Sequence, residues 1–284
     1  MVIKMSVYKC PVCSSELNLF NKSYKCKNNH SFDLSKKGYV NLILPNQGHS
    51  LNEGDSKEMI NSRRRFLQCE FYSSLKFKLS EICSSLIKNS VLYMFLDVAC
   101  GEGYYTNYIH NYLSKKFLIH SYGVDISKSA INASAGSRNM LNLKDISYCV
   151  GNMDYLPFLN NKFDILLNCF APLNEKEFHR VLNDNGYFIR VLPGKYHLYE
   201  LKEFLYSEIH LNLPKEDKIN GFLLENTIQV DDKITLNNEQ IQDLFTMTPY
   251  YYKTPFEAKE RLKKLETLTT QISFVIKVYR KIND

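Results

Sequence analysis

The stretch Leu96–Thr106 constrains the fold of this chain more than any other, because it joins a strand-like run to a helix-like segment through two glycines. The apolar run 91–98 ends here, and Gly101 and Gly103 precede a segment with helical spacing near 104–115. Glycines at such a turn let the backbone approach a ligand closely, and the N–H groups at the helix start face that ligand. We therefore predict a ligand site at this turn.

Strand-like and helix-like segments alternate through the middle of the chain, which predicts a parallel sheet covered by helices on both faces. Strands are expected over 91–98, 117–125, 146–150, 163–170 and 186–192, with helices near 104–115, 127–137 and 174–183. Beyond them we expect helices near 197–209 and 237–245, and a strand over 271–279. An earlier helix is expected from about Ser56 to Ile87, after a polar, glycine-containing linker over 46–58.

Residues around the turn distinguish a dinucleotide from S-adenosylmethionine as the ligand. A dinucleotide fingerprint has a third glycine or an alanine where this chain has Thr106. Asp97 precedes the turn and suits the ammonium of an amino-acid tail, while Asp125, 22 residues after Gly103, can accept both hydroxyls of a ribose. Asn152 and Met153 follow the third strand, where they can lie along an adenine. The pattern favours an S-adenosylmethionine-dependent methyltransferase of the class I (Rossmann-like) α/β fold.

A second constellation lies near the N-terminus, where Cys10 and Cys13 form a C-x2-C pair and Cys26 and His30 a C-x3-H pair. Three thiolates and one imidazole make a closed tetrahedral set, which is typical of structural zinc. A module of about 40 residues has too little core to fold alone, so Zn2+ is expected to supply its folding energy. The other cysteines lie in apolar segments and are expected to be core or near-core thiols: Cys69, Cys83, Cys100, Cys149 and Cys169.

The net charge of +6 is concentrated in residues 1–50, where seven lysines face only Glu16 and Asp33. A basic module joined to a near-neutral body suits contact with nucleic acid, although a solvated lysine surface explains the same excess. The first ten residues lack the apolar core of a signal peptide, and no stretch approaches the roughly 20 apolar residues of a membrane span. We expect a cytoplasmic protein without membrane contact, in which the cysteines are reduced.

Taken together, these residues resemble the bacterial 23S rRNA (guanine-N1)-methyltransferases, which modify a guanine in hairpin 35. The resemblance covers essentially the whole chain and is most specific over 30–43 and 54–67, two stretches that generic methyltransferases lack. It rests on CPVC with CKNNH, on HSFDLSKKGYVNLI (30–43), on GDSKEMINSRRRFL (54–67), on DVACGEGYYT (97–106) and on LPGKYHLYELK (192–202).

The resemblance implies a homodimer that acts on 23S rRNA, and it implies two sets of ligands. Zinc would be held by Cys10, Cys13, Cys26 and His30. The cofactor would be contacted by Tyr72, Gly101, Glu102 and His197. One departure is Ala99, where class I methyltransferases usually carry glycine; alanine is expected to be tolerated if the backbone there has a negative φ.

Basic residues are the candidates for contacts with RNA phosphates, since such charges dominate RNA affinity: Lys36, Lys37, Arg63, Arg64 and Arg65. Arg64 or Arg65 fits equally well as a partner for acids of the methyltransferase domain. Asp154 is a candidate base for the guanine N1 proton, and a loop-capping role fits it as well. The run 168–172 lacks the patterns of exocyclic-amine and cytosine-C5 methylation, which leaves a ring nitrogen by elimination.

We therefore expect a zinc-binding module over 1–45, a linker and connecting helix over 46–88, and a methyltransferase domain over 89–284. The expected function is transfer of a methyl group from S-adenosyl-L-methionine to N1 of a guanine in a 23S rRNA hairpin, which requires an unpaired or flipped base. Two alternatives stay open. One is a small-molecule methyltransferase with a purely structural zinc module, and the other is a non-catalytic rRNA-binding factor.

Overall fold

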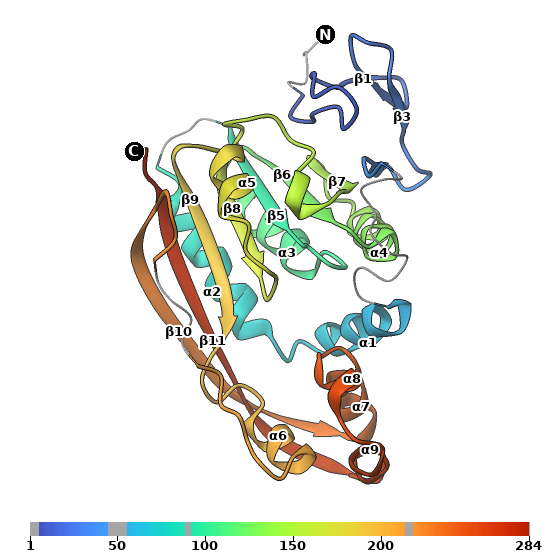
Figure 1. Ribbon diagram of the computed structural model, residues 1–284, viewed down its shortest axis with the longest axis vertical. Coiled ribbons are helices and arrows are strands. Elements are labelled where there is room, and N and C mark those ends of the chain that lie inside the picture. The colour runs from blue at the N-terminus through green and yellow to red at the C-terminus, as the bar shows by residue number, and fades with distance from the viewer. Residues whose placement is uncertain (1–5, 45–55, 89–91, 214–217, 284) are drawn as a thin grey trace.

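A large twisted sheet organises the protein, whose computed structural model describes residues 6–44, 56–88, 92–213 and 218–283 (Figure 1). In the described part of the chain its strands have the order β10-β11-β9-β8-β5-β6-β7-β4. The central strands are parallel, and β11 and β10 extend the sheet as an antiparallel pair. The strands are β4 (Val40–Asn41), β5 (Tyr93–Val98), β6 (Ile119–Asp125), β7 (Ile146–Val150), β8 (Phe163–Cys169), β9 (Leu182–Pro193), β10 (Phe222–Asn237) and β11 (Thr267–Lys281).

The order of the strands creates one topological switch point. The chain runs from β5 outward to β6 and β7, then returns to place β8 on the other side of β5. In an open α/β sheet, ligands bind outside the carboxyl ends of the strands at such a point. The ends of β5 and β8 therefore mark the position of a ligand site, in agreement with the sequence prediction.

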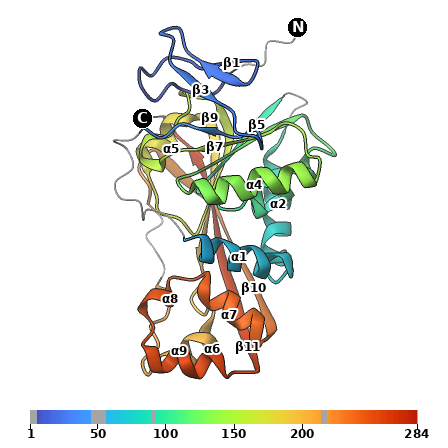
Figure 2. The same cartoon turned by 90° about the vertical axis from the view of Figure 1, so that its right-hand side faces the viewer.

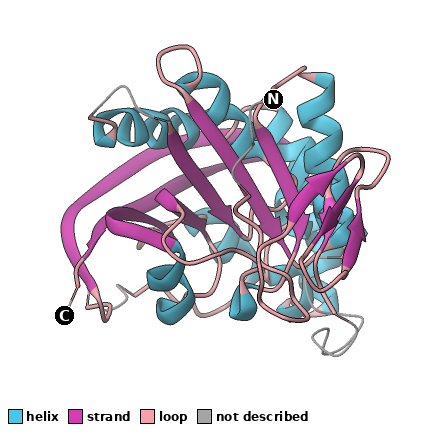
Figure 3. Cartoon of the chain, turned by 90° about the horizontal axis from the view of Figure 1, so that it is seen from above, coloured by secondary structure: helices cyan, strands magenta, loops and turns pink. Residues whose placement is uncertain are grey.

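Helices cover both faces of the sheet, as predicted (Figure 3). One face packs against α2 (Ser73–Leu86), α3 (Tyr104–Leu113) and α4 (Lys128–Met140), whose apolar side chains share cores with the strands. The other face packs against α5 (Glu175–Val181) and the N-terminal module. Between β7 and β8 only a short 3-10 helix, η1 (Met153–Tyr155), occurs, and the side chain of Tyr8 from the module fills the face there.

The N-terminal module is a small three-stranded antiparallel sheet of β1 (Asn18–Phe20), β2 (Ser23–Lys25) and β3 (Ser31–Asp33) (Figure 2). It is fixed to the large sheet in two places. Strand β4 pairs in parallel with β7. The ring of Tyr8 stacks on that of Phe158, and its centroid lies 5.0 Å from that of Tyr24 and 5.9 Å from that of Tyr122. The module is thus part of the core of the protein rather than a separate appendage.

The single helix predicted from about Ser56 to Ile87 is wrong, because the chain breaks there into α1 (Lys57–Gln68) and α2. Glu70 lies between them with φ +65°, a left-handed conformation that no helix interior accepts. Ser56 caps α1 by accepting a hydrogen bond from the N–H of Met59. The predicted linker over 46–58 overlaps the start of α1 at Lys57 and Glu58, and its residues up to 55 lie outside the described ones.

A distal lobe forms where β10 and β11 extend beyond the rest of the sheet, at the end opposite the zinc module (Figure 2). It carries α6 (Tyr199–Leu205), α7 (Asn238–Thr246), α8 (Tyr250–Lys253) and α9 (Phe256–Lys263). The sequence predicted α6, α7 and β11 but not β10, α8 or α9. None of the described helices has both the length and the apolar character that crossing a bilayer requires.

Candidate functional site

The four predicted metal ligands come together in the N-terminal module. The sulfur and nitrogen atoms of Cys10, Cys13, Cys26 and His30 all lie within 4.8 Å of one another. The Cys13 and Cys26 sulfurs are 3.7 Å apart, and Cys26 Sγ lies 3.4 Å from His30 Nδ1. Such separations match the edges of a tetrahedron around zinc, whose Zn–S bonds measure about 2.3 Å.

Two tight turns hold these ligands. The N–H of Ser14 donates to the carbonyl of Cys10, and the N–H of Asn29 donates to that of Cys26. Hydrogen bonds from Ser15 lower the pKa of the Cys13 thiol to about 5, which favours the thiolate that binds a metal. The donor set and its geometry fit zinc, and the four predicted side chains do come together.

The glycine turn lies at the carboxyl end of β5, directly at the switch point. Gly101 and Gly103 both have positive φ, +55° and +80°. A side chain at Gly103 would lie 2.8 Å from the Tyr148 hydroxyl, so only glycine fits there. Next to Gly101 the space is open, and the nearest atom to an added Cβ would be the Arg63 guanidinium at 3.8 Å.

Ala99 also has a positive φ, +59°, so the condition under which the sequence analysis expected alanine to be tolerated is not met. The turn therefore holds an L-residue in the left-handed region, which costs about 1–2 kcal/mol relative to glycine. The neighbouring Cys100 and Gly101 continue the turn toward α3.

Asp125 ends β6 and lies beside the same turn. One of its carboxylate oxygens accepts a hydrogen bond from the N–H of Gly101 at 2.9 Å, and the other accepts one from the N–H of Ser127 at 2.8 Å. Its position next to the turn is that expected of a carboxylate that binds a ribose. The N–H of Gly151 donates to the Asp125 carbonyl at 3.0 Å, which connects this strand end to the loop after β7.

Asp97 lies beneath the turn and is 2% exposed. Its carboxylate accepts a hydrogen bond from the Thr106 hydroxyl of α3. Burial, followed by the charges of Asp125 and Glu102, raises the pKa of Asp97 to about 7. A positively charged ligand above the turn would stabilise the ionised form.

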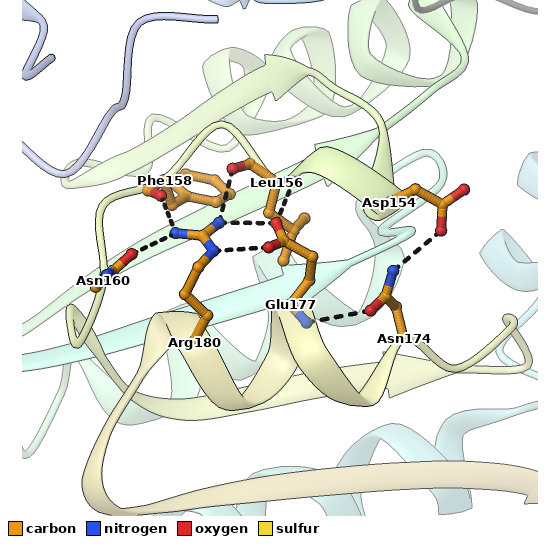
Figure 4. Close-up of polar contacts among 7 residues, drawn as sticks. All are labelled: Asp154, Leu156, Phe158, Asn160, Asn174, Glu177 and Arg180. Atoms are coloured by element: carbon orange, nitrogen blue, oxygen red, sulfur yellow. Dashed lines mark hydrogen bonds and ion pairs between the residues drawn. The ribbon is translucent and has the colours of Figure 1, made fainter. Parts of the chain in front are cut away.

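The loop after β7 carries Asn152 and Met153, the two residues predicted to lie along an adenine. Asn152 caps η1 by accepting a hydrogen bond from the N–H of Asp154. The exposed carboxylate of Asp154 accepts a hydrogen bond from Asn174 at 3.1 Å, a contact of the loop-capping kind (Figure 4). Its role as a base stays a prediction.

A polar network joins this loop to α5 (Figure 4). The guanidinium of Arg180 donates to the carbonyls of Leu156 and Phe158 at 3.0 and 2.7 Å. Glu177 forms an ion pair with Arg180 and accepts a hydrogen bond from the N–H of Leu156. The network replaces the regular hydrogen bonds that a helix would give this segment.

An aromatic cluster lies beside the turn and includes Tyr72 and His197, both predicted to contact the cofactor. The Tyr72 hydroxyl is 3.4 Å from His197 Nε2, and both rings pack against Phe274. The N–H of Ser273 donates to His197 Nδ1 at 3.2 Å, which leaves the proton of the neutral imidazole on Nε2. Burial, reinforced by the charge of Lys202, lowers the pKa of His197 to about 3, so the ring is neutral at physiological pH.

Phe170 completes this cluster, and the sequence analysis did not find it. It follows the last residue of β8, has φ +55° and is 43% exposed. Its ring is stacked with that of His197, with the planes at 21° and the centroids 6.3 Å apart. An exposed aromatic ring in a strained backbone conformation at the switch point is a candidate for ligand contact.

The predicted phosphate contacts separate into different environments. Lys36 is exposed, whereas the ammonium of Lys37 donates to the carbonyl of Asn132 in α4. Arg65 forms an ion pair with Asp243 of α7, with Nε 2.9 Å from one carboxylate oxygen, which is the pairing weighed as its alternative. Arg63 lies over the glycine turn and donates to the Met247 carbonyl, and Arg64 is half-buried.

The remaining cysteines mostly behave as predicted. Cys83, Cys100 and Cys149 are buried, and Cys169 is half-buried beside the aromatic cluster. Cys69 is exposed, because it follows the last turn of α1 where the chain leaves the core. The prediction that Cys69 is a core or near-core thiol is therefore wrong.

Two family models match the chain. The model described as "RlmA, N-terminal" matches residues 8–50, and one described as "Methyltransferase domain" matches residues 89–229. The chain therefore joins a zinc ribbon to a methyltransferase domain, as predicted. The glycine turn with Asp125 then fits S-adenosylmethionine, the methyl donor that such a domain uses, as predicted.

Curated relatives extend over nearly the whole chain. The 23S rRNA (guanine(748)-N1)-methyltransferase of Streptomyces fradiae is 26% identical, over 94% of this chain and 95% of its own. YxjB of Bacillus subtilis, to which 23S rRNA (guanine-N1)-methyltransferase activity is assigned provisionally, is 28% identical, over 96% and 98%. The crystal structure of YcgJ from Bacillus subtilis is similar in fold, with a TM-score of 0.52 at 14% identity, and covers 72% of this chain and 98% of its own.

Proposed function

We propose that this protein transfers a methyl group from S-adenosylmethionine to N1 of a guanine in 23S rRNA. The observation that carries the proposal is that relatives named for this reaction match both the zinc ribbon and the methyltransferase domain in a single alignment. By the resemblance, the guanine lies in hairpin 35. We also propose that the enzyme acts in the cytoplasm as a homodimer. In each chain the zinc-binding module would end at about residue 45, and the methyltransferase domain would begin after about residue 88.

The turn and the strand ends around it are proposed to hold the cofactor. In this assignment Gly101 and Gly103 give its backbone contacts, Asp125 binds the ribose, and Asn152 and Met153 lie along the adenine. Glu102, Tyr72 and His197 complete the pocket. Asp97 would stabilise the positive charge of the amino-acid part from beneath the turn.

Arg63 is assigned to the cofactor rather than to RNA. Its guanidinium lies 3.8 Å from where a Cβ on Gly101 would be, so it faces the open side of the turn. A guanidinium there suits the carboxylate of the methionine part of the cofactor, since arginine pairs with carboxylates through two parallel hydrogen bonds. Lys36 is retained as a phosphate contact because its side chain is exposed on the module.

Phe170 is proposed to stack on the target base. N1 lies on the Watson–Crick edge of guanine, so the base must leave its helix and be held against the methyl carbon. Base–aromatic stacking contributes about 1–3 kcal/mol per base. The neutral His197 beneath Phe170 keeps the ring in place and carries its proton on Nε2, so this imidazole is not assigned the guanine N1 proton.

Primer extension on 23S rRNA tests the function, because a methyl group on N1 stops reverse transcriptase. Ribosomal RNA from cells that have the gene should give a stop at a guanine in hairpin 35, and the stop should disappear when the gene is deleted. It should return with the wild-type gene and not with a Gly103→Val variant. An unchanged stop pattern on deletion refutes the proposal, and methylation of metabolites instead would identify a small-molecule enzyme.

A further inference from the structure

Helices α6, α8 and α9 lie together in the distal lobe (Figure 2). Their side chains line a cavity of about 670 Å³. Sites for one small organic ligand measure about 300–1,000 Å³, so the cavity has room for one nucleotide. We propose that it binds an unpaired nucleotide of the RNA substrate, near the base that is methylated. This inference rests on the proposed function and adds a second contact for the same RNA.

The first argument is a buried cation in the wall of the cavity. Lys202 of α6 is only 4% exposed. Its ammonium lies 3.3 Å from the Asn212 side-chain oxygen and 3.5 Å from the His210 carbonyl, both long for charged hydrogen bonds. No carboxylate among the described residues forms an ion pair with it, and burial lowers its pKa.

A buried ammonium without an anion is costly, because it has lost its water without gaining a counter-charge. A ligand with a negative group would supply that charge inside the cavity. Phosphate is the anion that every nucleotide of an RNA carries, and lysine is a common partner for it.

The second argument is the pair of aromatic rings in the same walls. Tyr206 and Tyr250 both line the cavity, with their ring centroids 6.2 Å apart in an edge-to-face arrangement. The Tyr206 hydroxyl is 2.9 Å from the Thr254 hydroxyl, which fixes its ring. Aromatic faces next to a cation are how proteins hold unstacked bases of single-stranded RNA.

The rim of the cavity carries charges of both signs. Lys253 and Arg261 are exposed there, and so are the carboxylates of Glu208 and Glu257. The two cations suit phosphates along the strand, whereas the two carboxylates would repel phosphate at their own positions. They can instead accept hydrogen bonds from the amino or imino groups of a base. A nucleotide presents both kinds of group, and a free inorganic anion does not.

The cavity adjoins the site proposed for the target base. Lys202 lies on α6, a helix that begins directly after His197 and Leu198, and after burial its charge is the second cause of the lowered pKa of His197. Burial raises the pKa of Tyr72, and the Tyr250 hydroxyl adds to this rise. The side chain of Asn212 donates to the Gly194 carbonyl, which holds the cavity wall against the loop that carries His197. A strand that delivers one base to Phe170 would therefore bring a neighbouring nucleotide to the cavity.

The test compares the affinity of the full-length, zinc-loaded protein for a transcript of hairpin 35, measured by fluorescence anisotropy. Lys253→Glu and Arg261→Glu should each weaken binding by about tenfold or more, since each removes one phosphate contact and adds a repulsion. Lys264→Glu is the matched control, because Lys264 is exposed at the end of the same α9 and does not line the cavity. It should change the affinity by less than about threefold.

Three outcomes would overturn the inference. One is hairpin binding by the cavity variants within about threefold of the wild type, while the wild type methylates the hairpin. Another is an equal loss with Lys264→Glu, which would indicate general charge attraction. The third is displacement of the hairpin by guanosine monophosphate at equal concentration, which would indicate a free nucleotide as the ligand. A wild type that neither binds nor methylates the hairpin would instead refute the proposed function itself.

Lys202→Met tests the buried cation separately, since methionine is unbranched and nearly as long as lysine but carries no charge. Its thermal midpoint should equal or exceed that of the wild type, and its affinity for the hairpin should fall by about tenfold. A variant that melts earlier yet binds the hairpin as tightly as the wild type would show a structural role for Lys202 and contradict the inference.

Discussion

Ala99 stands where class I methyltransferases usually carry glycine, and its backbone is strained there. It occupies the first position of the glycine turn, and its φ of +59° lies in the region that glycine adopts without cost. This φ could not be predicted from the sequence, because alanine normally has a negative φ. The strain is retained because the rest of the turn, including Gly101 and Gly103, fixes the backbone around it.

Replacing Ala99 with glycine should therefore stabilise the protein by about 1 kcal/mol, the cost of the left-handed conformation less the added entropy of the unfolded chain. The urea midpoint should rise with an unchanged slope. Ala133→Gly is the control, because Ala133 lies in the ordinary helix α4 and should lose about 1 kcal/mol instead. Destabilisation by both changes would contradict the assignment of strain.

His197 links the stability of the protein to pH. Burial lowers its pKa to about 3, whereas the unfolded chain has a histidine pKa of about 6.5. Between these values the unfolded state binds a proton that the folded state does not. The contribution to stability is thus complete above about pH 6.5 and is lost as the pH falls toward 3.

We expect His197→Gln to reduce the pH dependence in that window, because glutamine cannot take up the proton in the unfolded chain. Urea unfolding of the wild type and the variant at several pH values from 7 to 4 measures it. The difference in unfolding free energy between the two should shift in favour of the variant as the pH falls. A difference that is constant with pH would disprove the buried neutral state of His197.

At the scale of the elements, the loop between β7 and β8 depends on α5 for its shape. The side chains of Arg180 and Glu177 form hydrogen bonds with backbone groups of Leu156 and Phe158. The Asn174 side chain donates a hydrogen bond to the Asp154 carboxylate. Because Asn152 and Met153 precede these residues directly, the network also positions the residues proposed to lie along the adenine.

Arg180→Met should cost about 2 kcal/mol or more, since two buried carbonyls lose a charged donor and Glu177 loses its partner. Hydrogen exchange of residues 152–160 should become faster, and the affinity for S-adenosylmethionine, measured by calorimetry, should fall. Lys176→Met, an exposed change on the same helix, should alter neither. Wild-type affinity and exchange in Arg180→Met would argue against the positioning role.

The elements that the sequence predicted are those whose burial is nearly continuous. The runs that became β5 to β9 are apolar along most of their length, and the glycine turn marks the end of β5. Strand β10 was missed because most of its residues are exposed and polar, and β4 because two residues carry no pattern. The break between α1 and α2 at Glu70 has no local signal, since glutamate rarely adopts its conformation.

The candidate site could likewise be predicted only in part. Ligands close in sequence, such as the zinc residues and the glycine turn, could be recognised from spacing. Phe170 and Tyr250 could not, since their places depend on how β8 and the distal lobe meet α6. Arg63 was assigned to RNA because its charge was visible in the sequence and its position over Gly101 was not.

At the scale of the whole molecule, the zinc module and the methyltransferase sheet form a single structure. Tyr8, Phe158 and Tyr122 bury one another across the boundary, and β4 extends the large sheet beyond β7. Loss of the metal should therefore destabilise the large sheet as well as the module.

Removing zinc with a chelator should lower the thermal midpoint of the whole protein and weaken S-adenosylmethionine binding, because an unfolded module uncovers the loop after β7. Cys26→Ala should abolish the one zinc ion per chain that elemental analysis is expected to find. Cys69→Ala is the control, since Cys69 is exposed and outside the cluster. A cofactor affinity that is independent of zinc would separate the two parts functionally.

The pairing of β4 with β7 has a consequence for synthesis on the ribosome. The ribbon has all its metal ligands by residue 30 and can fold soon after it emerges. The edge on which it docks is made much later, once β6 and β7 have been translated and paired. During translation the N-terminal module should therefore bind its metal while Tyr8 is still exposed to solvent. The module can dock only after β6 and β7 have been made.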